Sequence, residues 1–260
     1  MPPFLETIKN FKTKLAGFRA KFSSPNKNDK ALQDLQNLAA SRPGDMRIQI
    51  KIADIYYQNK NLEMALETLQ GIAQKYIQQN FALKAVAVYK KMLMMNPSVA
   101  QTNMDLAGLF EKMNMPSDAV IQYRIALQQY YSSGTRDKVI EITKKIASLD
   151  GSLLNKRHLA EIYQSFGMLT EALQEFETVA QLYRQQKQFD ELLKLYEIIL
   201  PHKPTNHALI KDVCILYLRK QQPDHAIKTM ERYKVDADPA FNDLYEKAKL
   251  MKKALRSAKS

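Results

Sequence analysis

The fold is decided by residues 52–97, which read IADIYYQNKNLEMALETLQGIAQKYIQQNFALKAVAVYKKMLMMNP. This stretch contains two small residues, Ala65 and Ala85, which lie twenty positions apart at equivalent places on two expected helices. The same helical position recurs in alternating long and short steps, at Ala31, Ala65, Ala85, Ala119, Val139, Ala172, Leu192 and Ala226. An internal repeat determines the architecture before any local pattern does, because each repeat can bury its apolar face only against its neighbours.

A large residue precedes the small one at a constant distance. Tyr56, Phe110, Tyr163 and Tyr217 each lie nine positions before an alanine, and another large residue follows that alanine by four. The alanines are Ala65, Ala119, Ala172 and Ala226, and the residues that follow are Leu69, Tyr123, Phe176 and Met230. Spacings of three, four and seven place such residues on one face of a helix pair. Two helices cross closely only where one offers a small side chain, so we expect the alanines at the crossings and the four aromatic residues mostly buried beside them.

These positions resemble the tetratricopeptide-repeat (TPR) family, whose pattern is W-x2-L-G-x2-Y, then A-x3-F, then P. The resemblance covers roughly residues 28–235. The chain has no Trp, Ala or Cys replaces the Gly, and the late proline appears as Pro43, Pro97 and Pro204 with Asp150 in the remaining unit. Each departure keeps the size and polarity class of the position. The repeat predicts an all-α fold, a right-handed α-solenoid of TPR-like repeats with about fourteen helices.

The short steps depart further from the family pattern, because an ordinary array repeats at about 34 residues throughout. Each helix pair is followed by a third expected helix, at 81–95, 135–148 and 188–200. The repeating unit is therefore about 54 residues long and contains three helices. The alternative is an ordinary array that has lost one helix per pair, and the two descriptions fit nearly the same sequence.

Composition restricts the cellular context. The only cysteine, Cys214, lies at a core repeat position, which favours a buried, inert thiol in a reducing compartment. No apolar run approaches the roughly 20 residues of a membrane span, and the start of the chain does not resemble a secretory signal. We therefore expect a cytoplasmic protein, with a peripheral position at the inner face of the membrane as a further possibility.

The positive charge is concentrated at the two ends. The net charge is +12, and residues 1–42 carry 8 basic and 3 acidic residues. Residues 204–260 carry 12 basic and 7 acidic residues, whereas residues 43–203 are nearly balanced with 19 and 17. A nucleic-acid-binding solenoid would carry its charge along the whole groove, so nucleic acid is not the expected partner. Residues 239–260 are predicted to form a basic C-terminal capping helix after the repeat array at 29–235.

Residues 1–24 are predicted to form a separate basic amphipathic helix. Its apolar stripe consists of Phe4, Ile8, Phe11, Leu15, Phe18 and Phe22, and cations such as Lys12 and Arg19 flank it. Residues 29–40 match a third helix without its first two, so the array starts in mid-unit and needs cover. The N-terminal helix could cap that open end, dock on a partner, or lie on a membrane surface through residues 3–22.

Lysines recur at equivalent positions of the third helices. Lys30, Lys84 and Lys138 occupy one such position, and Lys90 and Lys144 occupy another. They could form a ladder that contacts a partner. The alternative is an ordinary solvated face, because charged runs usually serve solubility.

No catalytic, metal or cofactor signature is present, so we expect no enzyme, no cofactor and no small-molecule ligand. None of the four histidines pairs with another His or with Cys214 at metal-ligand spacing, and no phosphate-binding loop or nucleophile elbow occurs. Some TPR proteins hold acidic chaperone tails with a Lys–Asn clamp. The resemblance places one such pair at Arg157 and Glu161, and no unit has both clamp residues.

The leading hypothesis is a non-enzymatic adaptor or scaffold that binds a protein as a peptide, a helix or a small folded domain. The three-helix variant resembles repeats in adaptor proteins of gliding and predatory bacteria, some of which engage a Ras-like polarity GTPase, so a small GTPase is the narrower hypothesis. The alternative is a peripheral membrane-surface or nucleic-acid binder that uses the basic N- and C-terminal helices.

Overall fold

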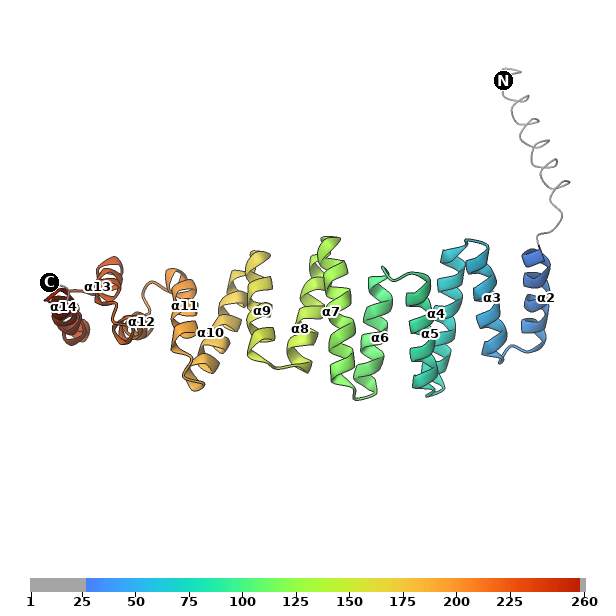
Figure 1. Cartoon of the computed structure of the whole chain (residues 1–260), viewed down its shortest axis with the longest axis horizontal. Coiled ribbons are helices and arrows are strands. Elements are labelled where there is room, and N and C mark those ends of the chain that lie inside the picture. The colour runs from blue at the N-terminus through green and yellow to red at the C-terminus, as the bar shows by residue number, and fades with distance from the viewer. Residues whose placement is uncertain (1–26, 258–260) are drawn as a thin grey trace, which may run out of the picture. The chain divides into compact units, whose positions relative to one another are not determined.

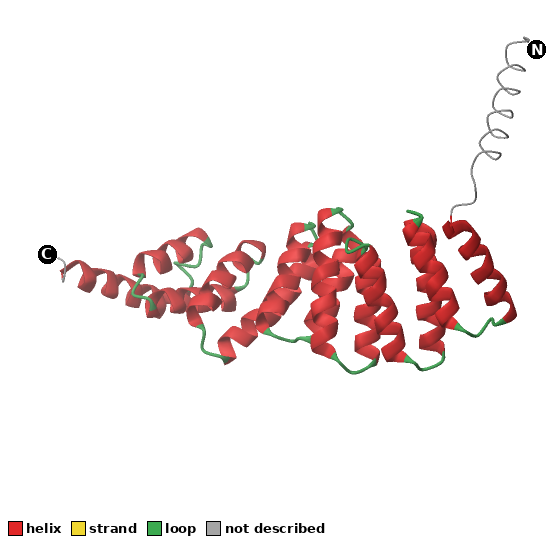
Figure 2. Ribbon diagram, turned by 45° about the vertical axis from the view of Figure 1, so that its right-hand side comes forward, coloured by secondary structure: helices red, strands yellow, loops and turns green. Residues whose placement is uncertain are grey.

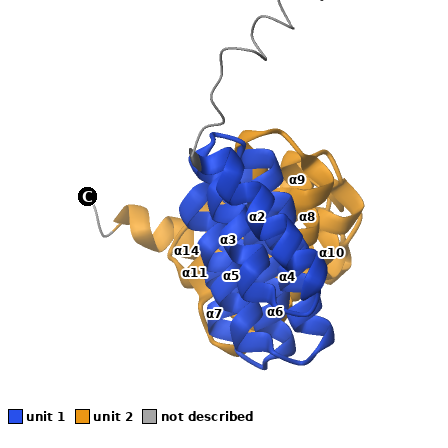
Figure 3. Ribbon diagram, turned by 90° about the vertical axis from the view of Figure 1, so that its right-hand side faces the viewer, with its two compact units in different colours: residues 1–129 blue, residues 130–260 orange. Residues whose placement is uncertain are grey.

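The computed structural model describes residues 27–257, which are helical with short connecting loops and contain no strand (Figures 1 and 2). It divides into two compact units, residues 1–129 and 130–260, each described here by itself (Figure 3). The predicted fold class is confirmed: the described chain is an all-α solenoid of TPR-like helical repeats. The helix predicted for residues 1–24 lies outside the described residues.

The described helices follow the predicted order. The first unit contains α2 (Lys27–Ser41), α3 (Met46–Gln58), α4 (Leu62–Gln78), α5 (Ala82–Met95) and α6 (Ala100–Lys112), and α7 (Pro116–Ser132) contains the unit boundary. The second contains α8 (Arg136–Leu149), α9 (Leu153–Ser165), α10 (Leu169–Gln185), α11 (Phe189–Ile199), η1 (Leu200–His202), α12 (His207–Arg219), α13 (Pro223–Arg232), η2 (Pro239–Phe241) and α14 (Asn242–Ser257). The predicted third helices correspond to α5, α8 and α11.

Helix length repeats with the same three-helix period. The first helices of the units, α3, α6, α9 and α12, each contain 13 residues. The middle helices α4, α7 and α10 contain 17 residues, and the third helices α5 and α8 contain 14. The middle helix is thus longer than the first and third helices of its unit.

The middle helix belongs to two hairpins at once. Helix α4 packs along both α3 and α5, and α10 packs along both α9 and α11. Small buried residues twelve positions apart, one on each helix, mark each hairpin. These pairs include Ala53 with Ala65, Ala73 with Ala85, Ala107 with Ala119, Ala160 with Ala172, and Cys214 with Ala226, all at most 1 % exposed. Since α4 carries the second residue of one pair and the first of the next, the step to the following helix is the short one.

The turns of the hairpins repeat as faithfully as the helices do. A residue with positive φ ends the first helix of each unit, at Lys60, Asn114, Gly167 and Gln221. The next residue donates its N–H to the carbonyl of the repeat aromatic, as in Asn61 to Tyr56 at 2.8 Å and Met168 to Tyr163 at 2.9 Å. This six-residue closure is the Schellman motif, which satisfies carbonyls left free at a helix C-terminus. The aromatic residue therefore fixes both the packing and the turn.

The repeat-defining residues occupy the core, with one exception. Ala65, Ala85, Ala119, Ala172 and Ala226 are fully buried. Phe110, Tyr163 and Tyr217 are at most 9 % exposed. Tyr56, which was expected to be mostly buried as well, stays partly exposed. It faces α2, of which none of the described side chains is buried, and its hydroxyl accepts a hydrogen bond from Gln36 Nε2 at 3.3 Å.

Helix α14 closes the core of the second unit. Ala248 is fully buried against α13 and η2, together with Phe241, and Leu244 and Met251 pack on the same cluster. Lys252 pairs with Asp224 of α13 at 2.5 Å. The remaining basic side chains and Leu250, which is 68 % exposed, lie on the outer side.

Candidate protein-binding grooves

The predicted partner-binding residues fall into two groups. The stripe of Phe4, Ile8, Phe11, Leu15, Phe18 and Phe22, with Lys12 and Arg19, lies outside the described residues. Lys30, Lys84 and Lys90 belong to the first unit, and Lys138 and Lys144 belong to the second. The lysine ladder is therefore divided between the two units.

Several of these lysines contact their own chain. Lys84 Nζ lies 4.2 Å from the centroid of the Phe81 ring, and Lys138 Nζ lies 2.9 Å from Glu141 Oε2. Lys144 Nζ lies 5.5 Å from the centroid of Tyr163, and the hydrogen bond to that hydroxyl is the main reason why the pKa of Lys144 is raised. Such contacts favour the view that these lysines cover aromatic rings of the array.

Alternate helices of the second unit share a face. On one face Arg184 of α10 pairs with Asp212 of α12, across the intervening helix α11. On the other face Arg157 of α9 pairs with Glu191 of α11 at 3.4 Å, across α10. The unit therefore has an α8–α10–α12 face and an α9–α11–α13 face, and the grooves of each face have the intervening helix as their floor.

One groove of the second unit lies between α10 and α12. It encloses about 410 Å³ and is lined by Glu177, Ala180, Gln181, Arg184, Gln185, Tyr196, Ile199, Asn206, Ala208, Leu209 and Asp212. Tyr196 of α11 forms the floor and is 8 % exposed. We call this feature the α10–α12 groove. It combines a buried aromatic floor with polar walls.

Two ion pairs stand at the rim of the α10–α12 groove. Arg184 Nη2 donates to Tyr196 Oη at 2.7 Å and also to Asp212, and the hydrogen bond to Asp212 is the first cause of the raised pKa of Arg184. Lys203, which precedes α12, pairs with Glu177 of α10. The side chains of these ions are between 35 % and 53 % exposed, so each pair contributes little to stability, about 0–1 kcal/mol. They can therefore exchange their partners for groups on a ligand at small cost.

The first unit has a related arrangement at the corresponding repeat positions. Gln70 Nε2 of α4 donates to Asp105 Oδ2 of α6 at 2.8 Å, and Gln101 donates to the other oxygen at 2.7 Å. Tyr89, which corresponds to Tyr196 two repeats later, is 3 % exposed, and burial raises its pKa to about 12. In the first unit, amide hydrogen bonds from Gln70 and Gln101 to Asp105 thus take the place of the ion pairs at the α10–α12 groove.

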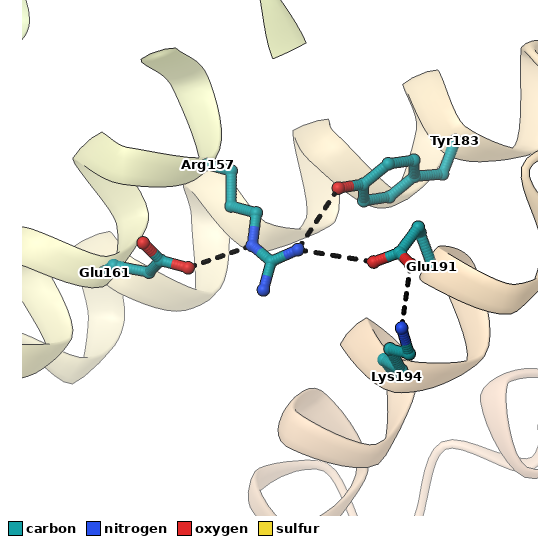
Figure 4. Close-up of polar contacts among 5 residues, drawn as sticks. All are labelled: Arg157, Glu161, Tyr183, Glu191 and Lys194. Atoms are coloured by element: carbon teal, nitrogen blue, oxygen red, sulfur yellow. Dashed lines mark hydrogen bonds and ion pairs between the residues drawn. The ribbon is translucent and has the colours of Figure 1, made fainter. Parts of the chain in front are cut away.

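A compact polar cluster joins α9, α10 and α11 (Figure 4). Arg157 donates from Nε to Glu161 at 2.9 Å, and from Nη1 to the Tyr183 hydroxyl and to Glu191, both at 3.4 Å. Lys194 donates to Glu191 at 2.8 Å, and this bond is the first cause of the lowered pKa of Glu191. Every charge in the cluster has a partner within the second unit.

Within residues 27–257 no group of three His, Cys, Asp or Glu side chains could hold a metal ion, and no helix is long and apolar enough to cross a membrane. Cys214 is fully buried, and burial raises the pKa of its thiol to about 12. The thiol is therefore protonated and inaccessible at neutral pH.

The sequence patterns did not single out the residues of the α10–α12 groove. Their positions vary from unit to unit, whereas the repeat pattern identifies positions that stay the same. One signal was available: Tyr89 and Tyr196 occupy the same repeat position in alternate units. Aligning alternate units would have indicated a shared groove floor.

No family model and no curated protein sequence matches the chain. Among solved structures it is similar to the TPR domain of P58(IPK), with 16 % identity over 88 % of this chain and 85 % of that one and a TM-score of 0.26. A MamA protein matches with 16 % identity over 65 % and 89 %, with a TM-score of 0.25. The C-terminal part of a TPR repeat-containing protein from Cytophaga hutchinsonii matches with 13 % identity over 73 % and 90 %, with a TM-score of 0.30. Such low values indicate nothing about what this chain binds.

Proposed function

We propose that the protein is a non-enzymatic scaffold that binds a segment of another protein in the α10–α12 groove. The observation that carries this proposal is the groove itself, with the Tyr196 floor between the Arg184–Asp212 and Lys203–Glu177 pairs. Tyrosine and arginine at the centre of a concave site are the residue types that contribute most to protein interfaces.

The walls of the groove suit a peptide backbone. Gln181, Gln185 and Asn206 line the groove and carry both donors and acceptors. The apolar share of the lining comes from Ala180, Ile199, Leu209 and the Tyr196 ring. A volume of about 410 Å³ lies at the low end of the range for ligand sites, so the groove accommodates a few side chains of a segment.

Steric block of the groove tests the proposal. Ala208 lines the groove and is exposed, so Ala208→Tyr would fill part of it without altering the core. Ala87→Tyr is the matched control, since Ala87 is an exposed alanine on α5 of the first unit. Affinity purification with mass spectrometry should recover partners with the wild type and with Ala87→Tyr and lose them with Ala208→Tyr. Equal recovery by both variants would contradict the assignment of the groove.

The same purification tests the narrower hypothesis of a Ras-like polarity GTPase, which rests on the three-helix period alone. The hypothesis would be supported if such a GTPase were recovered with the wild type and not with Ala208→Tyr. The alternative of a membrane-surface or nucleic-acid binder predicts flotation with anionic vesicles, or a gel shift with DNA or RNA, that Ala208→Tyr leaves unchanged.

A further inference from the structure

The second unit has a smaller pocket on its other face, between α11 and α13. It encloses about 240 Å³, and its floor is Tyr217 of α12. The Tyr217 hydroxyl donates to Glu197 Oε1 at 2.7 Å, and the Tyr217 ring stacks on His225 with the centroids 5.3 Å apart. Lys228, Thr229 and Arg232 complete the α13 wall. We call this feature the α11–α13 pocket.

The residues of the α11–α13 pocket occupy repeat positions that carry different charges on α8 and α10, one unit earlier. Lys144 of α8 lies over Tyr163, and the carboxylates of Glu171 and Glu175 on α10 contribute to its raised pKa. The equivalent residues one unit later are Glu197, Tyr217, His225 and Thr229, and Lys228 and Arg232 replace Gln174 and Thr178. Lys144 thus lies near two glutamates. One unit later a glutamate stands at the lysine position, His225 and Thr229 stand at the two glutamate positions, and cations occupy the neighbouring positions 228 and 232.

The cations of the pocket are not neutralised by the described residues. The only carboxylate in the lining, Glu197, is engaged by Tyr217. Asp224, one turn before Lys228, pairs with Lys252 of α14 at 2.5 Å. Lys228 and Arg232 have no ion-pair partner within residues 27–257, in contrast to Arg157, Arg184, Lys203 and Lys220 of the same unit.

We propose that the α11–α13 pocket binds an acidic segment of a protein partner, with its carboxylates between Lys228 and Arg232. The Tyr217–His225 stack supplies a flat apolar surface for the stem of a Glu side chain. Both cations are on a helix that is buried on its other side through Ala226, Ile227 and Met230, so their backbone positions are fixed before binding. This proposal rests on the scaffold function, and it concerns a different face from the α10–α12 groove.

The probe is a fluorescein-labelled octaglutamate peptide, titrated by fluorescence anisotropy at physiological ionic strength. Lys228→Glu/Arg232→Glu should weaken its binding at least tenfold, and the neutral pair Lys228→Gln/Arg232→Gln should also weaken it. The matched control is Lys211→Glu/Lys247→Glu, which changes the net charge equally at exposed positions outside both cavities and should change the affinity less than twofold. Raising the salt concentration should weaken wild-type binding, because these charges are exposed to solvent.

Three results would overturn the proposal. Equal losses in the two Glu double variants would mean attraction to the overall charge alone. Binding of a single-stranded oligonucleotide of equal charge that is tighter and depends on Lys228 and Arg232 would indicate a nucleic acid. If the wild type did not bind octaglutamate, the proposal that the α11–α13 pocket binds an acidic segment would be wrong. The proposed function of the α10–α12 groove would still be tested separately, by the purification with Ala208→Tyr.

Discussion

At the scale of single residues, the glycines in the turns between helices affect stability through their backbone conformation. Gly167 has a φ of +76°, and a Cβ built on it meets nothing within 4 Å. Gly151 is equally open and has no positive φ. The two glycines therefore differ in backbone conformation and not in packing, which makes them a matched pair.

We expect Gly167→Ala to destabilise the second unit by about 1 kcal/mol, because an L-residue with a side chain is strained in the left-handed region. Gly151→Ala should be neutral or slightly stabilising, since it only restricts the unfolded chain. Urea unfolding followed by circular dichroism measures both. If Gly151→Ala proved as costly as Gly167→Ala, the Schellman closure onto Tyr163 would not be the source of the effect.

At the scale of helices, the middle helices α4 and α10 each pack along two neighbouring helices. Ala172 and Ala180 of α10 are the small residues of its two hairpins, at 0 % and 3 % exposure. Substitution of either by Leu should destabilise by roughly 1–3 kcal/mol, because extra methylenes in a packed crossing displace neighbouring side chains. Ala208→Leu on α12, at an exposed position, should cost far less.

Denaturant unfolding of the three variants would compare these costs. A tolerated Ala180→Leu beside a harmful Ala172→Leu would mean that α10 packs closely in only one hairpin. The prediction for Ala119→Leu on α7 is the same as for Ala172→Leu, because Ala119 is also fully buried.

The sequence was sufficient to predict the helices and their period, because residues such as Ala65 and Phe110 are constrained by contacts that every unit repeats. The sequence did not reveal that Ala73 on α4 and Ala180 on α10 are small packing residues for the next hairpin. Each lies only eight positions after the first small residue of its helix, Ala65 or Ala172, so it falls outside the repeat steps. The grooves could not be predicted from the sequence patterns for a different reason. Arg184 and Asp212 meet only because α10 and α12 lie on the same face, and that neighbourhood depends on packing.

At the scale of the whole chain, the start of the array is its least covered part. None of the described side chains of α2 is buried, and Leu38 is 39 % exposed. Deletion of residues 1–24 should therefore lower the melting temperature, by about 2–4 °C for each kcal/mol of lost cover. Differential scanning calorimetry of the deletion measures this. The double variant Lys12→Gln/Arg19→Gln, which keeps the apolar stripe, is the control and should melt like the wild type.

An unchanged melting temperature together with lost partner or vesicle binding would identify residues 1–24 as an external docking segment. Loss of neither stability nor binding would contradict both roles.

The three-helix unit has a consequence for how the number of repeat units in such a chain can change. Alternate helices share a face, so an odd number of helices per unit places equivalent helices of successive units on opposite faces, as α10 and α13 show with their grooves. Duplication or loss of one unit would move every later binding surface to the other side of the molecule. Two units would return it to the same side. A lineage that adds repeats while keeping its partner is therefore expected to add them in pairs.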